Sequence, residues 1–575
     1  MKAKPHQTIY QMAALSLIGL LIGMITSFTT VGFVELVHDM NRVLFISTGS
    51  RAQLAGMELA MVTVAVLTLG GLVVGLILRY GTVKGENHGP PEAIYAVQLR
   101  ERLPSPMSGM ASTLASMISL GCGASVGQYG PLVYLGSLVG QLANRLQLGL
   151  RDIRSIAIAC GVAAAISAGF NAPIAGLIFT HEVILRHYSL RMFTAVTIAS
   201  ACGYVVANVI FNHPPLFLIE YHSAFRAPEF LLFALEGISC GILAVVFMKL
   251  LQRATELSKR VTIPAAAKPM LAGFLVSLVA LQVPEVLGAG QEVFRLASMP
   301  GSYTADALLL ILVAKLLVTV LCIGFGFAGG VIYPSMLIGV LFGALYAILV
   351  PEFFLGDYSG LSVYAICGMV AVMSPVIGAP MTALLLIFEL TRNYEITIAA
   401  MVTIVFANLV SFQWCGRSIY DAQLASRGMD LSLGRERAYL KHRKVTEYIA
   451  QPFAVVHQDT RVCELRRQLE MNPNATTSAV VTDKEGIYLG QVTHHQLRGI
   501  DENSLVSSIE LQQDTEFNET TNIWQAMETM RTFIGEAIVV VDSRSGAYLG
   551  AIPEAVVISA YLDAAQELRR EEHEA

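Results

Sequence analysis

Charged residues are scarce in this chain. Asp, Glu, Lys and Arg make up 14% of its 575 residues, whereas ordinary soluble domains carry about 25%. The deficit is uneven: residues 1–430 are about 10% charged with a net charge of +3, and residues 431–575 are about 25% charged with a net charge of −8. Neither part is basic enough to predict nucleic-acid binding. The split predicts a membrane body followed by a soluble tail.

Motifs for metal binding and catalysis are also missing. The eight cysteines are scattered without CxxC or metal-ligand spacing, and seven lie in apolar stretches, which is typical of buried small hydrophobic residues. The membrane part contains no HExxH or paired-histidine motif. The sequence therefore predicts neither a metal site nor an enzyme, and no cofactor beyond a transported ion.

Long apolar runs are present instead. A helix needs about 20 apolar residues to cross a ~30 Å hydrocarbon core. Five runs are candidates, namely Met12–Val34, Leu59–Leu78, Phe230–Leu251, Pro269–Leu287 and Ala307–Ile323. Lys2 and Lys4 precede the first run without an obvious cleavage site, so we expect a retained first helix with a cytoplasmic N-terminus. Other apolar stretches are broken by glycine and proline, which is typical of transporters and channels.

The membrane part contains an internal duplication. Gly121–Pro131 aligns without gaps to Gly324–Pro334. Further along the chain, Cys160–Glu182 aligns without gaps to Cys367–Glu389. Broken helices at matching places in two repeats predict a central site between them.

The two related halves lie at about residues 10–215 and 230–425, and the sequence leaves their relative orientation open. Their glycine-rich loops end in a proline just before an apolar helix, which leaves backbone N–H groups free at the positive end of the helix dipole. Such an end can hold an anion without a buried cation. Intramembrane acids, which a cation site would need, are few, chiefly Glu182 and Glu389. The pattern favours an anion.

Five short motifs in this order resemble those of the CLC family of chloride channels and proton/anion exchangers. They are Asn87–Pro91 followed by Glu92, Gly127–Pro131, Gly169–Gly176, Gly330–Pro334 and Gly416–Tyr420. The first, second and fourth match the family's anion motifs at helix N-termini. The resemblance covers nearly the whole chain and implies a mostly α membrane protein, built as a bundle of inverted repeats with broken helices.

The resemblance also implies which residues line the anion pathway. They are His88, Gly89, Tyr129, Gly130, Gly330, Val331, Ile332, Tyr333 and Tyr420, the last donating its hydroxyl to the anion from the cytoplasmic side. A voltage-gated chloride channel or an exchanger is implied, with several spans in the cell (inner) membrane and both termini in the cytoplasm. Its implied partners are a second copy of the chain, with one pore per subunit, the lipid bilayer and a small inorganic anion, chloride by default.

Two departures from the family's pattern concern proton carriers. In the family, a glutamate at the position of Tyr129 gates the pore and carries protons, and exchangers usually have a second proton glutamate at the position of Val183. A tyrosine, whose reference pKa is about 10, is a poor proton shuttle at neutral pH. The sequence therefore predicts a passive, proton-uncoupled channel or uniporter. The alternatives are a proton-coupled exchanger with other carriers, such as His88, and a channel selective for bicarbonate, nitrate or fluoride.

Several candidate residues have a structural interpretation beside the functional one. Tyr129 either gates the outer mouth of the pathway or packs in the core. His88, which takes the place of the family's anion-binding serine, either binds the anion or is a structural histidine. Glu182 and Glu389 either act in transport or hydrogen-bond at helix ends. His181 is expected at the interfacial surface.

The tail contains a second duplication, in which Gly486–Gly490 matches Gly546–Gly550 within a repeated helix–strand–turn–strand pattern. Two such units resemble a cytoplasmic α/β pair of CBS modules. The expected limits are a linker at 431–445, the modules at 446–503 and 504–562, and a charged end at 563–575.

CBS modules often bind adenine nucleotides through a GxxTxxD-like end. Here Gln496 and Val556 stand where the aspartate is needed, and Pro553 replaces the second threonine. We therefore expect no adenine nucleotide at the pair and favour dimer stabilisation as its role. A cation transporter with CBS modules is an alternative class, but it would need an acidic pore, which the acid-poor membrane part does not offer.

Overall fold

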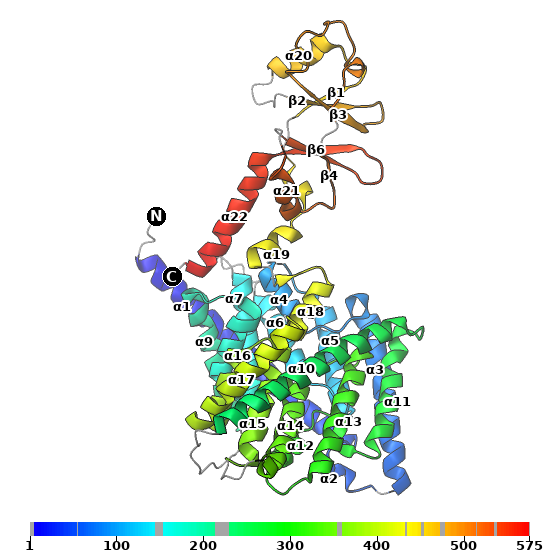
Figure 1. The fold of residues 1–575 in the computed structure, drawn as a ribbon. Helices are drawn as coiled ribbons and strands as arrows, with labels where there is room; N and C mark the ends of the chain where they lie inside the picture. The colour runs from blue at the N-terminus through cyan, green and yellow to red at the C-terminus, as the bar shows by residue number, and fades with distance from the viewer. Residues whose placement is uncertain are drawn as a thin grey trace. The chain divides into compact units, whose positions relative to one another are not determined.

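The chain divides into two compact units. The computed structural model describes residues 5–54, 56–99, 101–143, 153–212, 229–353, 359–431, 434–449, 453–471, 478–512, 515–533 and 537–573. The first unit is Met1–Gly428 and the second is Met429–Glu574, so the boundary lies close to the predicted limit at residue 430. The first unit is helical and the second contains two small sheets (Figure 1).

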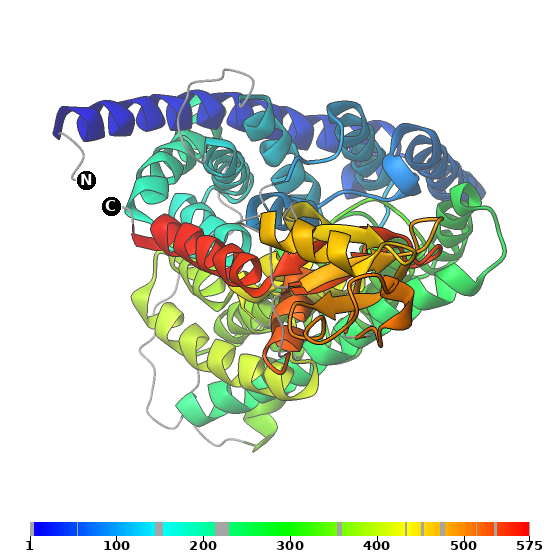
Figure 2. The same ribbon diagram turned by 90° about the horizontal axis from the view of Figure 1, so that it is seen from above.

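The first half of the membrane unit begins with the long helix α1 and ends with α9, which is followed by a π-turn. Its helices are α1 (Pro5–Val43), α2 (Thr48–Arg51), α3 (Gly56–Gly81), α4 (Pro90–Gln98), α5 (Pro106–Gly121), α6 (Tyr129–Ala143), α7 (Ile153–Phe170), α8 (Pro173–Phe179), with a π-turn at Thr180–Leu185, and α9 (Leu190–Tyr204), with a π-turn at Val205–Ile210. The long α1 lies along one side of the unit, where it packs on α5, α7 and α9 (Figure 2).

The second half repeats the pattern. Its helices are α10 (Glu229–Arg260), α11 (Lys268–Ala280), α12 (Gln291–Ala297), α13 (Ala305–Gly324), α14 (Ile332–Phe353), α15 (Leu361–Ile377), α16 (Pro380–Thr391), α17 (Tyr394–Trp414) and α18 (Ile419–Ser426). Under the repeat alignment, α5 to α9 correspond to α13 to α17 in order. The duplication seen in the sequence is therefore a duplication of helices.

Glycine contacts repeat with the helices. A Cβ atom at Gly136 would lie 2.3 Å from the carbonyl oxygen of Gly161, where α6 packs on α7. At the equivalent place, a Cβ atom at Gly339 would lie 2.3 Å from the carbonyl oxygen of Gly368, where α14 packs on α15. Glycine lets both helix pairs approach to backbone contact, as small residues do in membrane bundles.

Four of the five predicted spans lie within long helices, namely α1, α3, α10 and α13. The prediction of a span over Pro269–Leu287 was wrong, because α11 ends at Ala280 and a short 3₁₀ turn follows at Pro284–Val286. A proline disfavours helical backbone in the residue before it, and Val283 accordingly has φ −130° and ψ 79°. In the described part of the chain, eight helices are long and apolar enough to cross a membrane.

The tail consists of two α/β units, as predicted. After α19 (Arg435–His442), the first has β1 (Ala454–His457), α20 (Val462–Met471), β2 (Ser478–Thr482) and β3 (Tyr488–Thr493), and the second has β4 (Phe517–Asn518), α21 (Ile523–Met530), β5 (Ala537–Val541), β6 (Tyr548–Pro553) and α22 (Glu554–His573). In each sheet the first two strands are parallel and the last two antiparallel.

The two α/β units meet through their matching glycine turns. The Tyr488 N–H donates to the carbonyl of Gly546 at 3.0 Å, and the Tyr548 N–H donates to the carbonyl of Gly486 at 3.0 Å. This reciprocal pair relates the units by an approximate two-fold axis. The architecture resembles a CBS pair, as the sequence predicts.

Candidate functional site

The two halves of the membrane unit meet at the N-termini of α6 and α14. The Gly127 N–H donates to the carbonyl of Gly330 at 2.8 Å, and the Gly330 N–H donates to the carbonyl of Gly127 at 2.7 Å, in an antiparallel bridge. The two loop segments therefore run in opposite directions at this contact, in keeping with the inverted repeats that the family resemblance implies. A Cβ atom at Gly130 would lie 2.8 Å from the Cα of Gly330, so only glycine allows this approach.

The first turns of α6 and α14 keep unclaimed N–H groups. The helical hydrogen bonds begin at Leu132, which donates to Gln128, and at Ser335, which donates to Val331. The N–H groups of Tyr129, Gly130, Ile332 and Tyr333 therefore have no intrahelical acceptor, and no other protein acceptor for them lies among the described residues. Two helix N-termini with four free donors thus lie side by side in the core, which is the chemistry of an anion site.

The N-termini of α8 and α16 are capped instead. Glu389 accepts from the N–H groups of Ile174 at 2.8 Å and Ala175 at 2.7 Å. In the other half, Glu182 accepts from the N–H groups of Met381 at 2.9 Å and Thr382 at 2.8 Å. Each repeat supplies the cap of the other, so the geometry favours the structural interpretation of Glu182 and Glu389.

The N-terminus of α4 is also occupied by the protein. The carboxylate of Glu92 accepts from the Gly89 N–H at 2.6 Å and from Arg427. Pro90 and Pro91 have no N–H to offer. The anion motif at residues 87–91 therefore has fewer open donors than the motifs that begin α6 and α14.

The backbone and the ring of His88 both contact neighbouring side chains. Its N–H donates to the hydroxyl of Ser112 at 2.8 Å, its Nε2 lies 2.9 Å from the hydroxyl of Ser108, and its Nδ1 lies 3.9 Å from Glu92. The ring is buried and lies 5.2 Å from the ring of Tyr134. These contacts support the structural interpretation of His88 and leave its role toward an anion a prediction.

Tyr129 begins α6 and lies in the core. Its ring stacks on Phe170 with centroids 3.5 Å apart, and its hydroxyl donates to the carbonyl of Gly169 at 3.2 Å. The ring of Tyr333, the second residue of α14, lies 6.0 Å away. Tyr129 therefore packs as a core side chain and also lines the place where the free N–H groups converge.

Two predicted pathway tyrosines have buried hydroxyls without a protein partner. They are Tyr333, on α14, and Tyr420, on α18, and neither hydroxyl finds a hydrogen-bond acceptor or donor among the described residues. A buried hydroxyl without a partner costs about 1–3 kcal/mol. Both are suited to donate to an anion.

The predicted surface position of His181 was wrong. The sequence placed it at the interfacial surface, but its side chain is fully buried. The chain continues past α8 as a π-turn, where His181 Nδ1 lies 3.1 Å from the carbonyl of Leu177 and the ring stacks on Tyr188 at 5.2 Å. Val183, in the same turn, is buried as well.

Sequence reasoning missed two charged residues that are fully buried inside predicted spans. Lys315 on α13 donates to the carbonyls of Val286 at 2.9 Å and Gly288 at 2.8 Å, so its ammonium group holds the loop before α12. Glu236 lies on α10 and is fully buried. Each lies inside a predicted apolar span, and a charged residue in such a span could have been recognised from the sequence as unusual.

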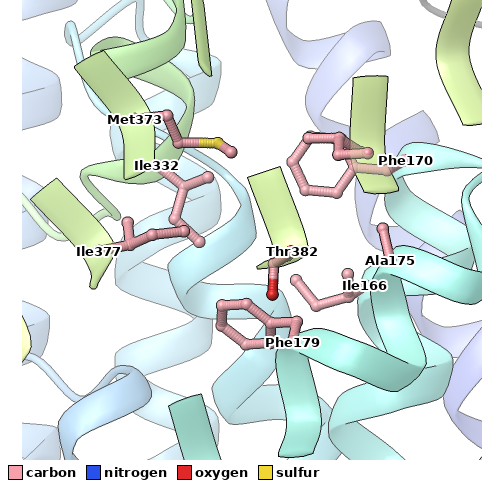
Figure 3. A pocket seen from close by; sticks show the side chains of 9 residues that line it. Ile166, Phe170, Ala175, Phe179, Ile332, Met373, Ile377 and Thr382 are labelled. Atoms are coloured by element: carbon pink, nitrogen blue, oxygen red, sulfur yellow. The ribbon is translucent and has the colours of Figure 1, made fainter. Parts of the chain in front are cut away.

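A small apolar cavity lies between the halves (Figure 3). Four pairs of its lining residues are equivalent in the repeats, namely Ile166 and Met373, Phe170 and Ile377, Ala175 and Thr382, and Phe179 and Leu386. Ile332, whose N–H is free, completes the wall near α14, and Thr382 is the only polar side chain in the lining. The volume open to the centre of a water molecule is ≈ 10 Å³, which holds about one water at most.

A family model described as "Voltage gated chloride channel" matches residues 70–412. The chain belongs to this family. The H(+)/Cl(−) exchange transporter ClcA of Vibrio cholerae is 30% identical over 319 residues, which cover 54% of this chain and 67% of the relative. The chloride channel protein CLC-f of Arabidopsis thaliana is 29% identical over 424 residues, which cover 68% of this chain and 52% of the relative.

Solved structures agree on the fold of this chloride channel family member. A slow cyanobacterial Cl⁻/H⁺ antiporter has a TM-score of 0.65 and 21% identity and covers 72% of this chain and 97% of its own. A eukaryotic CLC transporter has a TM-score of 0.63 and 18% identity and covers 94% of this chain and 97% of its own. The predicted CLC family and mostly helical membrane fold are confirmed, and the members of this family are channels or transporters rather than enzymes.

Proposed function

We propose that the protein is a passive, proton-uncoupled anion channel or uniporter of the cell membrane, with chloride as the default anion. The observation that carries the proposal is the pair of open helix N-termini at Tyr129, Gly130, Ile332 and Tyr333, bridged by Gly127 and Gly330. In this proposal the anion is bound by these N–H groups, with the hydroxyls of Tyr333 and Tyr420 as further donors.

The absence of proton carriers supports uncoupled flux. Tyr129 and Val183 stand where exchangers of the family carry glutamates. The cavity between the halves has no titratable side chain among its lining residues and room for about one water at most. A relay needs a continuous series of exchangeable protons or ordered waters, and one threonine hydroxyl with room for about one water does not supply it.

A proton gradient test separates this proposal from its main alternative. Purified protein in liposomes with an outward chloride gradient should release chloride without moving protons uphill, because no carboxyl occupies position 129 or 183. A chloride electrode and a pH electrode measure the two fluxes together. Uphill proton movement driven by chloride would refute uncoupled flux and favour an exchanger.

The exchanger is the second candidate function because relatives bear that name. ClcA of Vibrio cholerae is an H(+)/Cl(−) exchange transporter, and one structure of this fold is a CLC-type fluoride/proton antiporter. An exchanger would need other proton carriers, for which His88 was predicted, and fluoride, nitrate and bicarbonate remain alternative cargoes. Competition among these anions in the same assay ranks them.

From the family resemblance we also propose how the protein is assembled and gated. It forms a homodimer with one pore per subunit, both termini lie in the cytoplasm, and gating depends on voltage. The CBS-like tail is proposed to stabilise the dimer rather than bind adenine nucleotide, since Gln496 and Val556 replace the acids that would hold a ribose.

Changing Tyr129 tests its proposed role beside the anion. Tyr129→Ala should alter chloride flux and anion selectivity, because the ring covers the place where the free N–H groups meet. Tyr129→Phe, which keeps the stacking on Phe170 and removes only the hydroxyl bond to Gly169, is the matched control and should retain most of the flux. Chloride and nitrate fluxes in liposomes are the measurement. Parental flux and selectivity in a folded Tyr129→Ala protein would favour the packing role alone.

A further inference from the structure

One carboxyl group in the membrane unit has surroundings unlike the others. Glu236 lies on α10, it is fully buried, and neither of its carboxyl oxygens has a hydrogen-bond partner among the described residues. The nearest donor is the backbone N–H of Gly368, in the middle of α15, and its approach to the carboxyl group falls short of normal hydrogen-bond geometry. This carboxyl group has no role in the proposed anion site.

Glu229 makes the contrast clear. It lies seven residues before Glu236 on α10, two turns away on the same face. Its carboxylate accepts from the Ser359 N–H at 2.6 Å and from the Tyr364 hydroxyl at 3.1 Å. The carboxylates that cap α4, α8 and α16 likewise accept from backbone N–H groups. Of these carboxyl groups, Glu236 is the one without a donor.

Glu236 lies against the contact between α14 and α15. A Cβ atom at Gly368 would lie 2.5 Å from the carbonyl oxygen of Gly339 on α14 and 3.1 Å from Glu236 Oε1. The carboxyl group thus fills the space that the missing side chain of Gly368 leaves open. Any change in the size or hydration of the carboxyl group therefore acts directly on the backbone contact between α14 and α15.

In the described part of the chain, no group that faces Glu236 is a cation. The groups are the neutral side chains of Cys240 on the same helix, Tyr346 on α14, and Tyr364 and Cys367 on α15, with the carboxylate of Glu229 farther along α10. No charged or titratable group of α13 or α17, which also pack on α10, acts on Glu236 in the described part of the chain. No cation therefore compensates a negative charge here.

Burying an ionised carboxylate without a partner costs far more than a protein's stability allows, so such a group keeps its proton. We propose that Glu236 is a proton-binding site inside the membrane unit, and that loss of its proton at alkaline pH loosens the contact of α10 with α15 and slows anion flux. The bound proton regulates transport and is not carried with the anion, so the inference goes beyond the proposed function.

Infrared spectroscopy tests the bound proton directly. The full chain at neutral pH should show the C=O stretch of a protonated carboxyl group, and Glu236→Gln should remove that band. Glu229→Gln is the matched control, on the same face of the same helix, and should keep the band. If the parent lacks the band, or if Glu236→Gln retains it, the proposal is wrong.

Flux and stability test the consequence. Chloride efflux from liposomes should fall several-fold in the parent as the pH is raised from neutral to alkaline, and Glu236→Gln should be insensitive over the same range. The same variant should melt at a higher temperature than the parent, by a margin that grows with pH, because folding the parent must keep a proton that the unfolded chain releases. An equal pH response of both proteins would overturn the regulation.

The two proposals fail in different ways. If the protein carries no chloride, every variant lacks flux, while the infrared band and the melting difference still report on Glu236. Should Glu236→Gln fail to fold, Glu236→Met, which is also neutral and of similar length, replaces it in each measurement. A folded Glu236→Met protein with the parent's band and pH response would refute the proton site.

Discussion

Replacing Gly330 with alanine should lower chloride flux at least about tenfold, which corresponds to about 1.4 kcal/mol, and should reduce the free energy of unfolding by about 1–3 kcal/mol. A Cβ atom at this position would lie 2.7 Å from the nitrogen and 2.9 Å from the Cα of Gly130. Both neighbours are backbone atoms that cannot rotate away. The N-termini of α6 and α14 must therefore separate, and their N–H groups no longer converge. Chloride efflux from liposomes and denaturant unfolding in detergent measure the two effects.

Gly32→Ala is the matched control for this variant. Gly32 lies within α1, and a Cβ atom there would have nothing within 4 Å. Alanine favours helix over glycine by up to about 1 kcal/mol, so this variant should keep its flux and lose no stability. Equal flux in the Gly330→Ala protein and the parent would contradict an anion site at the α6–α14 junction.

Glu182→Ala and Glu389→Ala should each lower the free energy of unfolding by about 2 kcal/mol or more. Each change leaves two first-turn N–H groups without an acceptor, those of Met381 and Thr382 or those of Ile174 and Ala175. A lost helix cap costs about 0.5–2 kcal/mol, and a hydrogen bond to a charged group contributes about 1.5–3 kcal/mol. Denaturant unfolding monitored by circular dichroism gives the loss in stability.

A difference between the two caps sharpens this prediction. Glu182 accepts a third hydrogen bond, from the Thr382 hydroxyl at 2.7 Å, whereas Glu389 faces Ala175, so Glu182→Ala should lose somewhat more stability than Glu389→Ala. Glu58→Ala, which removes an exposed glutamate from the first turn of α3, should change stability by only a few tenths of a kcal/mol. If Glu182→Ala kept the parent's stability but lost its flux, Glu182 would act in transport rather than as a cap.

Much of the fold could be predicted from local sequence patterns. Four apolar runs become α1, α3, α10 and α13, and the gap-free alignment of Gly121–Pro131 with Gly324–Pro334 becomes two matching loops before α6 and α14. Length and hydropathy suffice for a span because backbone groups in lipid must be satisfied within the helix. The failure at Pro269–Leu287 arose from Pro284, whose effect on the preceding backbone outweighs apolar composition.

Local sequence patterns predicted only part of the candidate site. The motifs predicted three helix N-termini at the anion pathway, those of α4, α6 and α14. They did not show that α8 and α16 are capped by glutamates about 200 residues away or that Glu92 caps α4. The sequence left His88 open between anion binding and structure, and its contacts with Ser108 and Ser112 appear only on folding. His181 was placed at the surface because its neighbours in space, Tyr188 and Phe193, could not be foreseen.

The sequence by itself determined the membrane character, the two repeats, the tail of two α/β units and the absence of carboxyl groups at Tyr129 and Val183, because each depends on composition or on residues close in the chain. Tertiary structure alone decided that the loops before α6 and α14 pair in opposite directions and that both helices keep their first N–H groups free. It also left Glu236 without a donor. Hydrogen-bond satisfaction is a property of neighbours in space, and at the Gly127–Gly330 bridge and the caps of α8 and α16 those neighbours come from the opposite repeat.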